Sequence, residues 1–281
     1  MASHLTEKEG NSIIDQKRFA FIELMLIWEG RIQIKHISSQ FELSEKLAKH
    51  ILQKYKNLYP DNLLYQGSND CYQVTQSMVA QFSSGSLQEY MQIMGGNDNV
   101  SSLELPNRNL QPEIIRPILQ AIREQRRLQM GYASVSAPEF SMRVIQPHHL
   151  VFDGMRWHVR GFCEKNQDYR DFVLSRFQSP TPAELLNDAD HFDLQDEAWN
   201  TLLSVSFMPD PRLDDNRARI IALDYDMEKA LKGYRKTMKV RQALLMYWVQ
   251  RMGLNQYNNN PQAQQIILTP ESEQMLKEYL P

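Results

Sequence analysis

The chain has 281 residues, enough for about two domains of ordinary size, each with its own hydrophobic core. Its composition is 42% hydrophobic and 23% charged, and 31 Lys and Arg against 34 Asp and Glu give a formal charge of −3. These values are typical of a globular protein and exclude a disordered or fibrous one. Two distant cysteines exclude a disulfide scaffold, and no apolar run reaches the roughly 20 residues that span a bilayer. Because the first ten residues also lack an apolar stretch, we expect no signal peptide and a soluble, cytoplasmic protein.

Charged residues are unevenly distributed along the chain, which suggests separate modules with separate partners. Basic residues predominate over 31–58, arginines are frequent over 107–177, and acids predominate over 183–215. A polar, glycine-containing stretch that begins at Gly95 predicts a linker, and two prolines in 208–211 predict a second break. We therefore expect a first domain at 1–95, a linker at 96–111, a second domain at 112–207 and a third at 208–281.

The first domain is predicted to contain three helices followed by a β-hairpin. A broad apolar face over 19–28 indicates a mostly buried helix that ends at Gly30. A short helix follows at 34–41, and Ser44 is a favourable N-cap for a third helix. The buried stripe of this third helix is predicted from helical spacing to be Leu47, Ile51, Tyr55 and Leu58. Two short strands flanking a polar turn come next, at 63–65 and 71–74.

This order of elements predicts a winged helix-turn-helix, in which one helix lies in the DNA major groove and the hairpin reaches the phosphates or the minor groove. Lysines on the outer face of that helix would contact phosphates, and His50 or Gln53 could reach base edges. The residues that we expect to contact DNA are Ser44, Lys46, Lys49, His50, Gln53 and Lys54 in the helix, and Ser68 and Asn69 in the turn. The alternative is a small helical bundle whose solvated face happens to be basic.

The second domain is predicted to begin with a helix at 112–128 and to continue as a small β-sheet. Asp153-Gly154 is a typical hairpin turn between two of its strands. Thr181, followed by a proline and by Glu184, predicts the start of another helix. The expected strands are 129–135, 141–145, 150–152, 156–163 and 170–177.

Arginine and histidine side chains gather on this predicted sheet. Strand alternation places Arg156, His158 and Arg160 on one face, and Cys163 on the other, where we expect it to be core. Converging guanidinium groups would form an anion site, because their planar fork matches phosphate geometry. The alternative is a basic face whose arginines pair with nearby acids. The spacings typical of metal, hydrolase, nucleoside-triphosphatase and dinucleotide sites do not occur, so that we expect no catalytic residues, metal or cofactor.

The third domain is predicted to be a small α/β unit. The expected elements are a strand at 218–225, a long amphipathic helix at 227–252, a strand at 265–269 and a short closing helix. The long helix has more large apolar residues than such a unit needs for its core. These residues are therefore either core or a dimer surface.

Three stretches of the second domain together resemble a WYL domain. They are Pro147-His148-His149-Leu150, Gly154 to Phe162 and Tyr169 to Phe177. The stretch from Phe41 to Tyr72 resembles the winged helix that accompanies such domains in bacterial regulators, and the nearest subgroup is the transcriptional repressors encoded beside phage-defence systems. One departure is that the tripeptide that gives the domain its name reads Trp157-His158-Val159 here.

The resemblance implies an α+β protein with three domains: an N-terminal winged helix-turn-helix, a central Sm-like β-barrel WYL domain and a small C-terminal α/β dimerisation domain. It implies a basic pocket that senses a nucleotide or nucleic-acid ligand. Carried over by position, the pocket candidates are Tyr132, Arg143, His149, His158, Arg160, Arg170 and Arg176.

These observations lead us to expect a homodimeric transcriptional repressor that binds a double-stranded DNA operator with an inverted repeat. An anionic, nucleotide-like effector would modulate that binding, and no membrane would be involved. One alternative is a nucleic-acid-processing enzyme that holds its substrate on the arginine-rich sheet, although no paired carboxylates support it. Another is a ligand-binding adaptor without a DNA role, which the net charge of −3 would suit.

Overall fold

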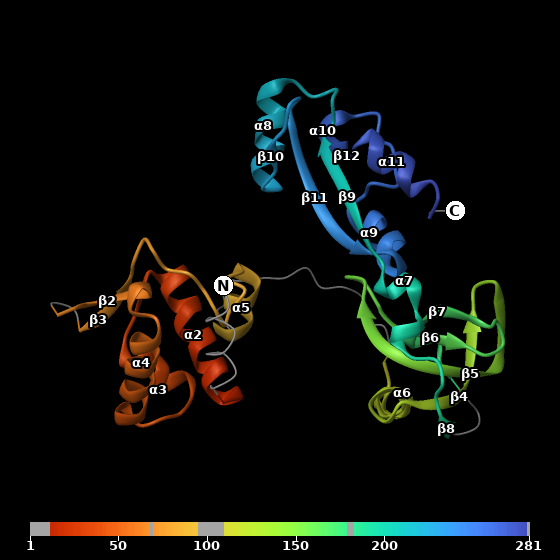
Figure 1. Ribbon diagram of the computed structural model, residues 1–281, viewed down its shortest axis with the longest axis horizontal. Coiled ribbons are helices and arrows are strands. Elements are labelled where there is room, and N and C mark those ends of the chain that lie inside the picture. Colours follow the sequence, from red (N-terminus) through yellow and green to blue (C-terminus); the bar gives the residue numbers. More distant parts are fainter. Residues whose placement is uncertain (1–11, 68–69, 95–109, 179–182, 280–281) are drawn as a thin grey trace. The chain divides into compact units, whose positions relative to one another are not determined.

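The computed structural model describes residues 12–67, 70–94, 110–178 and 183–279 (Figure 1). The chain divides into two compact units, Met1–Leu103 and Glu104–Pro281. The described part of the first unit is a helical body with a three-stranded sheet of order β1-β3-β2. Its elements are α2 (Ile13–Glu29), β1 (Arg31–Ile32), α3 (Ile34–Gln40), α4 (Glu45–Leu58), β2 (Leu63–Gln66), β3 (Cys71–Val74) and α5 (Leu87–Met94).

Local signals set the helix ends of the first unit where the sequence predicts them. Gly30 ends α2 in the left-handed conformation at φ 70°, and the Ser44 hydroxyl caps α4 by accepting from the Leu47 backbone N–H. The buried stripe of α4 shares only Ile51 and Tyr55 with the expected one: Ala48 and Leu52 are buried as well, whereas Leu47 is 41% exposed and Leu58 is half-buried.

A buried carboxylate at Glu23 fastens the segment after the hairpin to α2. Its two oxygens accept the backbone N–H groups of Gln81, Phe82 and Ser83. The Tyr55 hydroxyl donates to it as well, at 3.2 Å. Because a buried carboxylate needs such donors, the charge in the apolar α2 has a structural role that periodicity did not predict.

The second unit begins with α6 and an open antiparallel sheet of order β7-β6-β5-β4-β8. The closed barrel implied by the family resemblance is not formed by the described residues, since β7 and β8 are both edges. Ile118 and Ala121 of α6 pack on one face, where Val159 and Cys163 are core as expected. These elements are α6 (Pro112–Glu124), β4 (Arg126–Ser134), β5 (Ala137–Phe152), β6 (Trp157–Cys163), β7 (Asp168–Val173) and β8 (Glu184–Asp188).

Two expectations for this sheet are wrong. The strands expected at 141–145 and 150–152 are parts of the single strand β5. Thr181, the expected start of a helix, lies outside the described residues, and the segment after it is the strand β8, which pairs with β4 through Leu185 and Leu128. Pairing with β4 satisfies the β8 backbone, and this long-range contact overrides the local capping signal.

The C-terminal part of the second unit contains a four-stranded sheet of order β10-β11-β9-β12. Its central strand β9 begins at Leu202, so residues before the expected boundary at 208 already belong to this sheet. The elements are α7 (Glu197–Asn200), β9 (Leu202–Pro209), α8 (Asp215–Asp224), β10 (Glu228–Lys229), β11 (Tyr234–Arg241), α9 (Leu245–Arg251), α10 (Pro261–Gln264), β12 (Ile266–Leu268) and α11 (Pro270–Leu276).

The expected secondary structure of this region is wrong in two places. The residues expected to form a strand at 218–225 instead form helix α8 up to Asp224, with Asp214 as its N-cap and Tyr225 as its C-cap. The expected helix at 227–252 is instead β10, β11 and α9, because Gly233 at φ 72° turns the chain and β11 pairs with β9. Of its apolar residues, Leu245 and Val249 are core, whereas Leu231, Met238 and Met246 are exposed.

Candidate functional site

The outer face of α4 carries most of the residues predicted to contact DNA. Lys46, Lys49, His50 and Gln53 are all exposed, while the opposite stripe of the helix is buried. Figure 1 shows α4 with α3 and the β2–β3 hairpin within the first unit. A groove of about 500 Å³ joins these elements, and it is lined by Gln33, Ile34, Lys35, Glu45, Lys46, Lys49 and Asp70. Lys35 of α3 is thus a cation at this surface that was not among the expected contacts.

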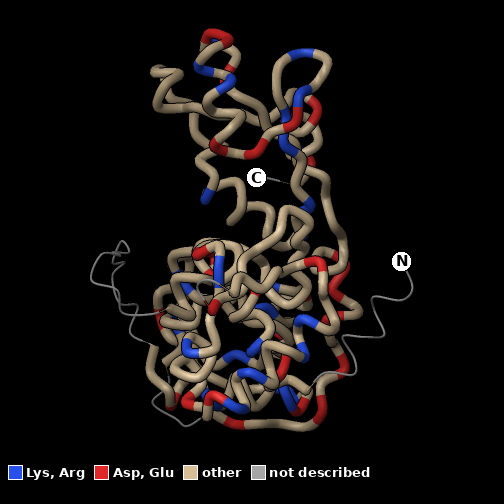
Figure 2. Tube along the Cα trace, turned by 90° about the vertical axis from the view of Figure 1, so that its left-hand side faces the viewer, with Lys and Arg blue, Asp and Glu red and all other residues tan. Residues whose placement is uncertain are grey.

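Besides Ser44, whose hydroxyl caps α4, two of the expected helix contacts have partners within the protein. Lys54 forms an ion pair with Asp15 of α2 at 2.6 Å, and its side chain is 38% exposed. The Gln53 amide donates to Asn57 at 2.8 Å on the exposed face, where an incoming base could compete for it. Ser68 and Asn69 lie outside the described residues. Figure 2 shows basic and acidic residues interspersed along most of the described trace, so the basic character of α4 is local.

Arg160 on β6 is buried in a network of carboxylates rather than open to a ligand. Its Nε and Nη2 donate to the two oxygens of Asp196 at 2.6 and 2.9 Å, and Nη1 donates to Asp171 at 3.2 Å. Burial by itself would raise the pKa of Asp196, but hydrogen bonds from His148 and Arg160 hold that pKa at about 2. Asp196 therefore remains charged near neutral pH and offsets the charge of the arginine.

Two of the predicted pocket histidines lie beside this network. His149 pairs with Arg160 across β5 and β6, and its ring lies 4.4 Å from that of Trp199. Burial and the neighbouring His148 lower the pKa of His149, so this ring is neutral at pH 7. His158 Nε2 lies 2.8 Å from a carboxylate oxygen of Asp153, and its buried Nδ1 has no hydrogen-bond partner among the described residues.

The other four pocket candidates lie elsewhere on the sheet. Tyr132 is core, where its ring packs on Phe172 and its hydroxyl accepts from the Val173 N–H. Arg143 is opposite Met130 in the β4–β5 register, and its Nε is buried without a partner among the described residues. Arg170 is exposed, and Arg176 is half-buried in the turn after β7. The structure therefore brings together only three of the seven: His149, His158 and Arg160.

The same network joins the WYL-like sheet to the C-terminal sheet. The Tyr247 hydroxyl of α9 donates to Asp171 at 3.2 Å, and its ring lies 4.7 Å from that of His158. Burial, together with the charge of Asp171, raises the pKa of Tyr247, which keeps its hydroxyl protonated. The Arg241 guanidinium of β11 lies 4.6 Å from the Trp199 ring centroid and donates to the Trp199 carbonyl. Sequence reasoning did not identify Asp196, Tyr247 or Trp199, because their partners are distant along the chain.

Within the described residues, no cluster of three or more His, Cys, Asp or Glu side chains could hold a metal ion. None of the described helices is long and apolar enough to cross a membrane.

Comparison with known proteins places this arrangement of domains in a family. The model for the winged helix-turn-helix of BrxR transcriptional regulators matches residues 15–96, that for the WYL domain matches 113–182, and that for the BrxR C-terminal dimerization domain matches 202–274. A DNA-binding transcriptional repressor CapW of Pseudomonas aeruginosa is 31% identical over 92% of this chain and 90% of its own length. The chain belongs to this BrxR/CapW family of WYL-domain transcriptional regulators.

Other members of the BrxR/CapW family show a similar likeness. CapW of Escherichia coli (strain KTE188) is 31% identical over 92% of this chain and 90% of its own length. CapW of Stenotrophomonas maltophilia is 28% identical over 96% of this chain and 94% of its own. The match to the C-terminal domain of the family begins at residue 202, which is also where β9 begins.

Proposed function

We propose that this protein is a homodimeric, sequence-specific DNA-binding transcriptional repressor that reads its operator with α4 and has no catalytic activity. The observation that carries the proposal is the two-sided character of α4: one stripe buried, and Lys46, Lys49, His50 and Gln53 exposed on the other. The family relatives named DNA-binding transcriptional repressors support it. In keeping with the repressors that the sequence resembles, its operator would belong to a phage-defence system.

The chemistry of the α4 surface suits DNA recognition. Lys46 and Lys49, with Lys35 beside them, supply point charges for phosphates, which fix position without reading sequence. His50 and Gln53 carry donors and acceptors that can distinguish base edges in the major groove. A dimer held by the C-terminal domain would present two such helices, so that the operator would be an inverted repeat with half-sites about one helical turn, or a multiple, apart.

The test is fluorescence anisotropy of labelled DNA from upstream of the protein's own gene, measured over a range of salt concentrations. A Lys46→Ala/Lys49→Ala variant is compared with Lys17→Ala/Lys165→Ala, which removes two exposed lysines from other surfaces. Loss of four phosphate contacts per dimer should reduce the slope of log K against log salt by about 3 to 4. The control should keep the slope of the parent protein. Equal losses in the two variants, or none in the first, would contradict the proposal.

We propose in addition that the WYL domain binds an anionic, nucleotide-like effector that alters operator affinity. The cluster of His149, His158 and Arg160 supports a polar site at this position. Because Arg160 already donates to Asp171 and Asp196, an anion at this cluster would have to displace one of those carboxylates. Titration of candidate nucleotides against the preformed DNA complex tests this part, and an unchanged operator affinity with all of them would contradict it.

A further inference from the structure

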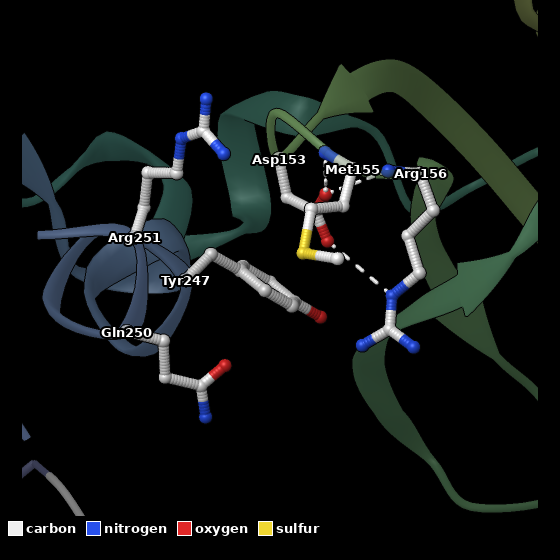
Figure 3. Close-up of a pocket in the computed structure, with 6 residues that line it drawn as sticks. All are labelled: Asp153, Met155, Arg156, Tyr247, Gln250 and Arg251. Atoms are coloured by element: carbon white, nitrogen blue, oxygen red, sulfur yellow. Dashed lines mark hydrogen bonds and ion pairs between the residues drawn. The ribbon is translucent and has the colours of Figure 1, made fainter. Parts of the chain in front are cut away.

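A cavity of about 210 Å³ lies where the turn between β5 and β6 meets helix α9. Figure 3 shows its two walls, one formed by the turn and the other by the helix, with Tyr247 of the helix extending towards Arg156 of the turn. The lining residues are Asp153, Met155 and Arg156 from the turn, and Tyr247, Gln250 and Arg251 from α9. Of these, only Arg156 lay on the sheet face that was expected to form an anion site, and none was among the seven pocket candidates carried over from the family.

The carboxylate of Asp153 in the cavity wall already accepts all the hydrogen bonds it can, and only one of these comes from an arginine side chain. One oxygen of Asp153 accepts the backbone N–H groups of Met155 and Arg156, both at 2.8 Å. The other oxygen accepts Arg156 Nε at 3.3 Å and lies 2.8 Å from Nε2 of His158. Burial alone would raise the pKa of Asp153, but the hydrogen bond to His158 and those from the two backbone groups lower it, so this carboxylate is charged at pH 7.

The cations of the cavity wall keep donors available. Arg156 uses only Nε on Asp153, and Arg251 is exposed with no hydrogen bond or ion pair among the described residues. Two arginines against one saturated carboxylate leave the wall with an excess positive charge. Gln250 adds an exposed amide donor. This arrangement favours an anion, because guanidinium groups hold phosphate or carboxylate oxygens with charge-assisted hydrogen bonds.

We propose that this cavity binds a small molecule that carries a doubly charged anionic group, such as a phosphate, on a flat apolar body. The anionic group would be held by the Arg251 guanidinium, and the apolar body would lie against Tyr247 and Met155. The volume is adequate, since a cavity of about 150 Å³ accepts benzene. Gly154 lets Arg251 approach, because a Cβ at this position would come within 2.9 Å of the arginine Nε.

Such a ligand would contact the WYL domain and the C-terminal domain at once. Tyr247 lines the cavity and also donates to Asp171, which in turn accepts from Arg160. Binding would therefore favour one arrangement of this contact over others and could alter how the C-terminal domain presents the DNA-binding units. This last consequence rests on the proposed function, whereas the binding site itself does not.

The test is isothermal titration calorimetry of the full chain without DNA, using phenyl phosphate, inorganic phosphate and phenol as probes. Phenyl phosphate should bind at least tenfold more tightly than either fragment, because only it uses both walls. Arg251→Ala and Arg251→Glu should weaken its binding by at least tenfold, as expected for loss of a charge-assisted hydrogen bond. Arg123→Ala, which removes an exposed arginine of α6 in the same unit, should leave the affinity unchanged.

Three results would overturn the site: no saturable heat with phenyl phosphate up to about 10 mM, equal affinity for phenyl phosphate and phosphate, or equal losses in Arg251→Ala and Arg123→Ala. Operator binding of the parent protein is measured separately. If the protein binds phenyl phosphate but no operator, the site stands and the proposed function fails. If it binds operator but not phenyl phosphate, the proposed function stands and the site fails.

Discussion

Replacement of Arg160 by methionine should destabilise the second unit severely, although the side-chain volume is nearly kept. The change leaves Asp196 buried with its remaining donors, His148 and the Trp199 N–H, and it removes a donor from Asp171. Removing one partner of a buried ion pair costs about 3–5 kcal/mol, because the other charge stays buried and uncompensated. For a unit of this size each kcal/mol lowers Tm by roughly 2–4 °C, so the expected decrease is about 6–20 °C.

The pH dependence of this loss identifies its cause. In the parent protein the pKa of Asp196 is lowered to about 2, so its contribution to stability is present above the ordinary aspartate pKa and is lost as pH falls towards 2. Without Arg160, fewer hydrogen bonds oppose the effect of burial, so the pKa of Asp196 is higher in the variant than in the parent. Asp196 of the variant is therefore protonated at a higher pH, which removes the unpaired buried charge. The difference in Tm between variant and parent should therefore shrink as pH falls.

Differential scanning calorimetry of the full chain measures these effects. Arg170→Met is the matched control, because its ion pair with Asp168 is 3.7 Å long and both side chains are more than half exposed, so its Tm should hardly change. Adding Asp196→Asn to Arg160→Met should recover part of the loss, since asparagine removes the orphan charge and can still cap α7. A decrease in Tm below about 2 °C for Arg160→Met, or no recovery in the double variant, would refute the reasoning.

Three further predictions follow from the packing. Ending the chain at Asn200, just before the central strand β9, should yield a protein that is a monomer by light scattering and binds operator DNA more weakly by orders of magnitude. A truncated protein that remains a tight dimer would contradict this. Glu23→Gln should lower the free energy of unfolding of the first unit, measured by urea denaturation, by about 2–4 kcal/mol, because an amide NH₂ would face backbone N–H donors. A loss below about 1 kcal/mol would refute this. Gly161→Ala should lower the free energy of unfolding of the second unit by about 1–3 kcal/mol or more, since its Cβ would lie 2.5 Å from the Gln146 carbonyl oxygen. An unchanged free energy of unfolding in the same assay would exclude that contact.

Features that depend on neighbours in sequence could be predicted from the sequence. Gly30 and Ser44 fix the ends of α2 and α4 through backbone conformation and a side-chain cap, and both act within four residues. The exposed face of α4 follows from helical periodicity alone, since burial of one stripe requires the opposite one to face solvent. These local signals predicted the winged helix, whereas the WYL domain and the order of the domains came from the resemblance of their motifs to a known family.

The partners of the candidate site could not be predicted, because they are set by contacts between distant segments. Asp196 is 36 residues from Arg160, and Tyr247 is 76 residues from Asp171. An arginine on a strand looks the same in sequence whether its fork is free for a ligand or filled by a buried carboxylate. The same reasoning applies to 234–241, whose apolar residues suit a helix until pairing with β9 satisfies its backbone as a strand. The sequence by itself thus determined the α4 surface, whereas only the tertiary structure decided that Arg160 is neutralised and that Arg251 keeps free donors.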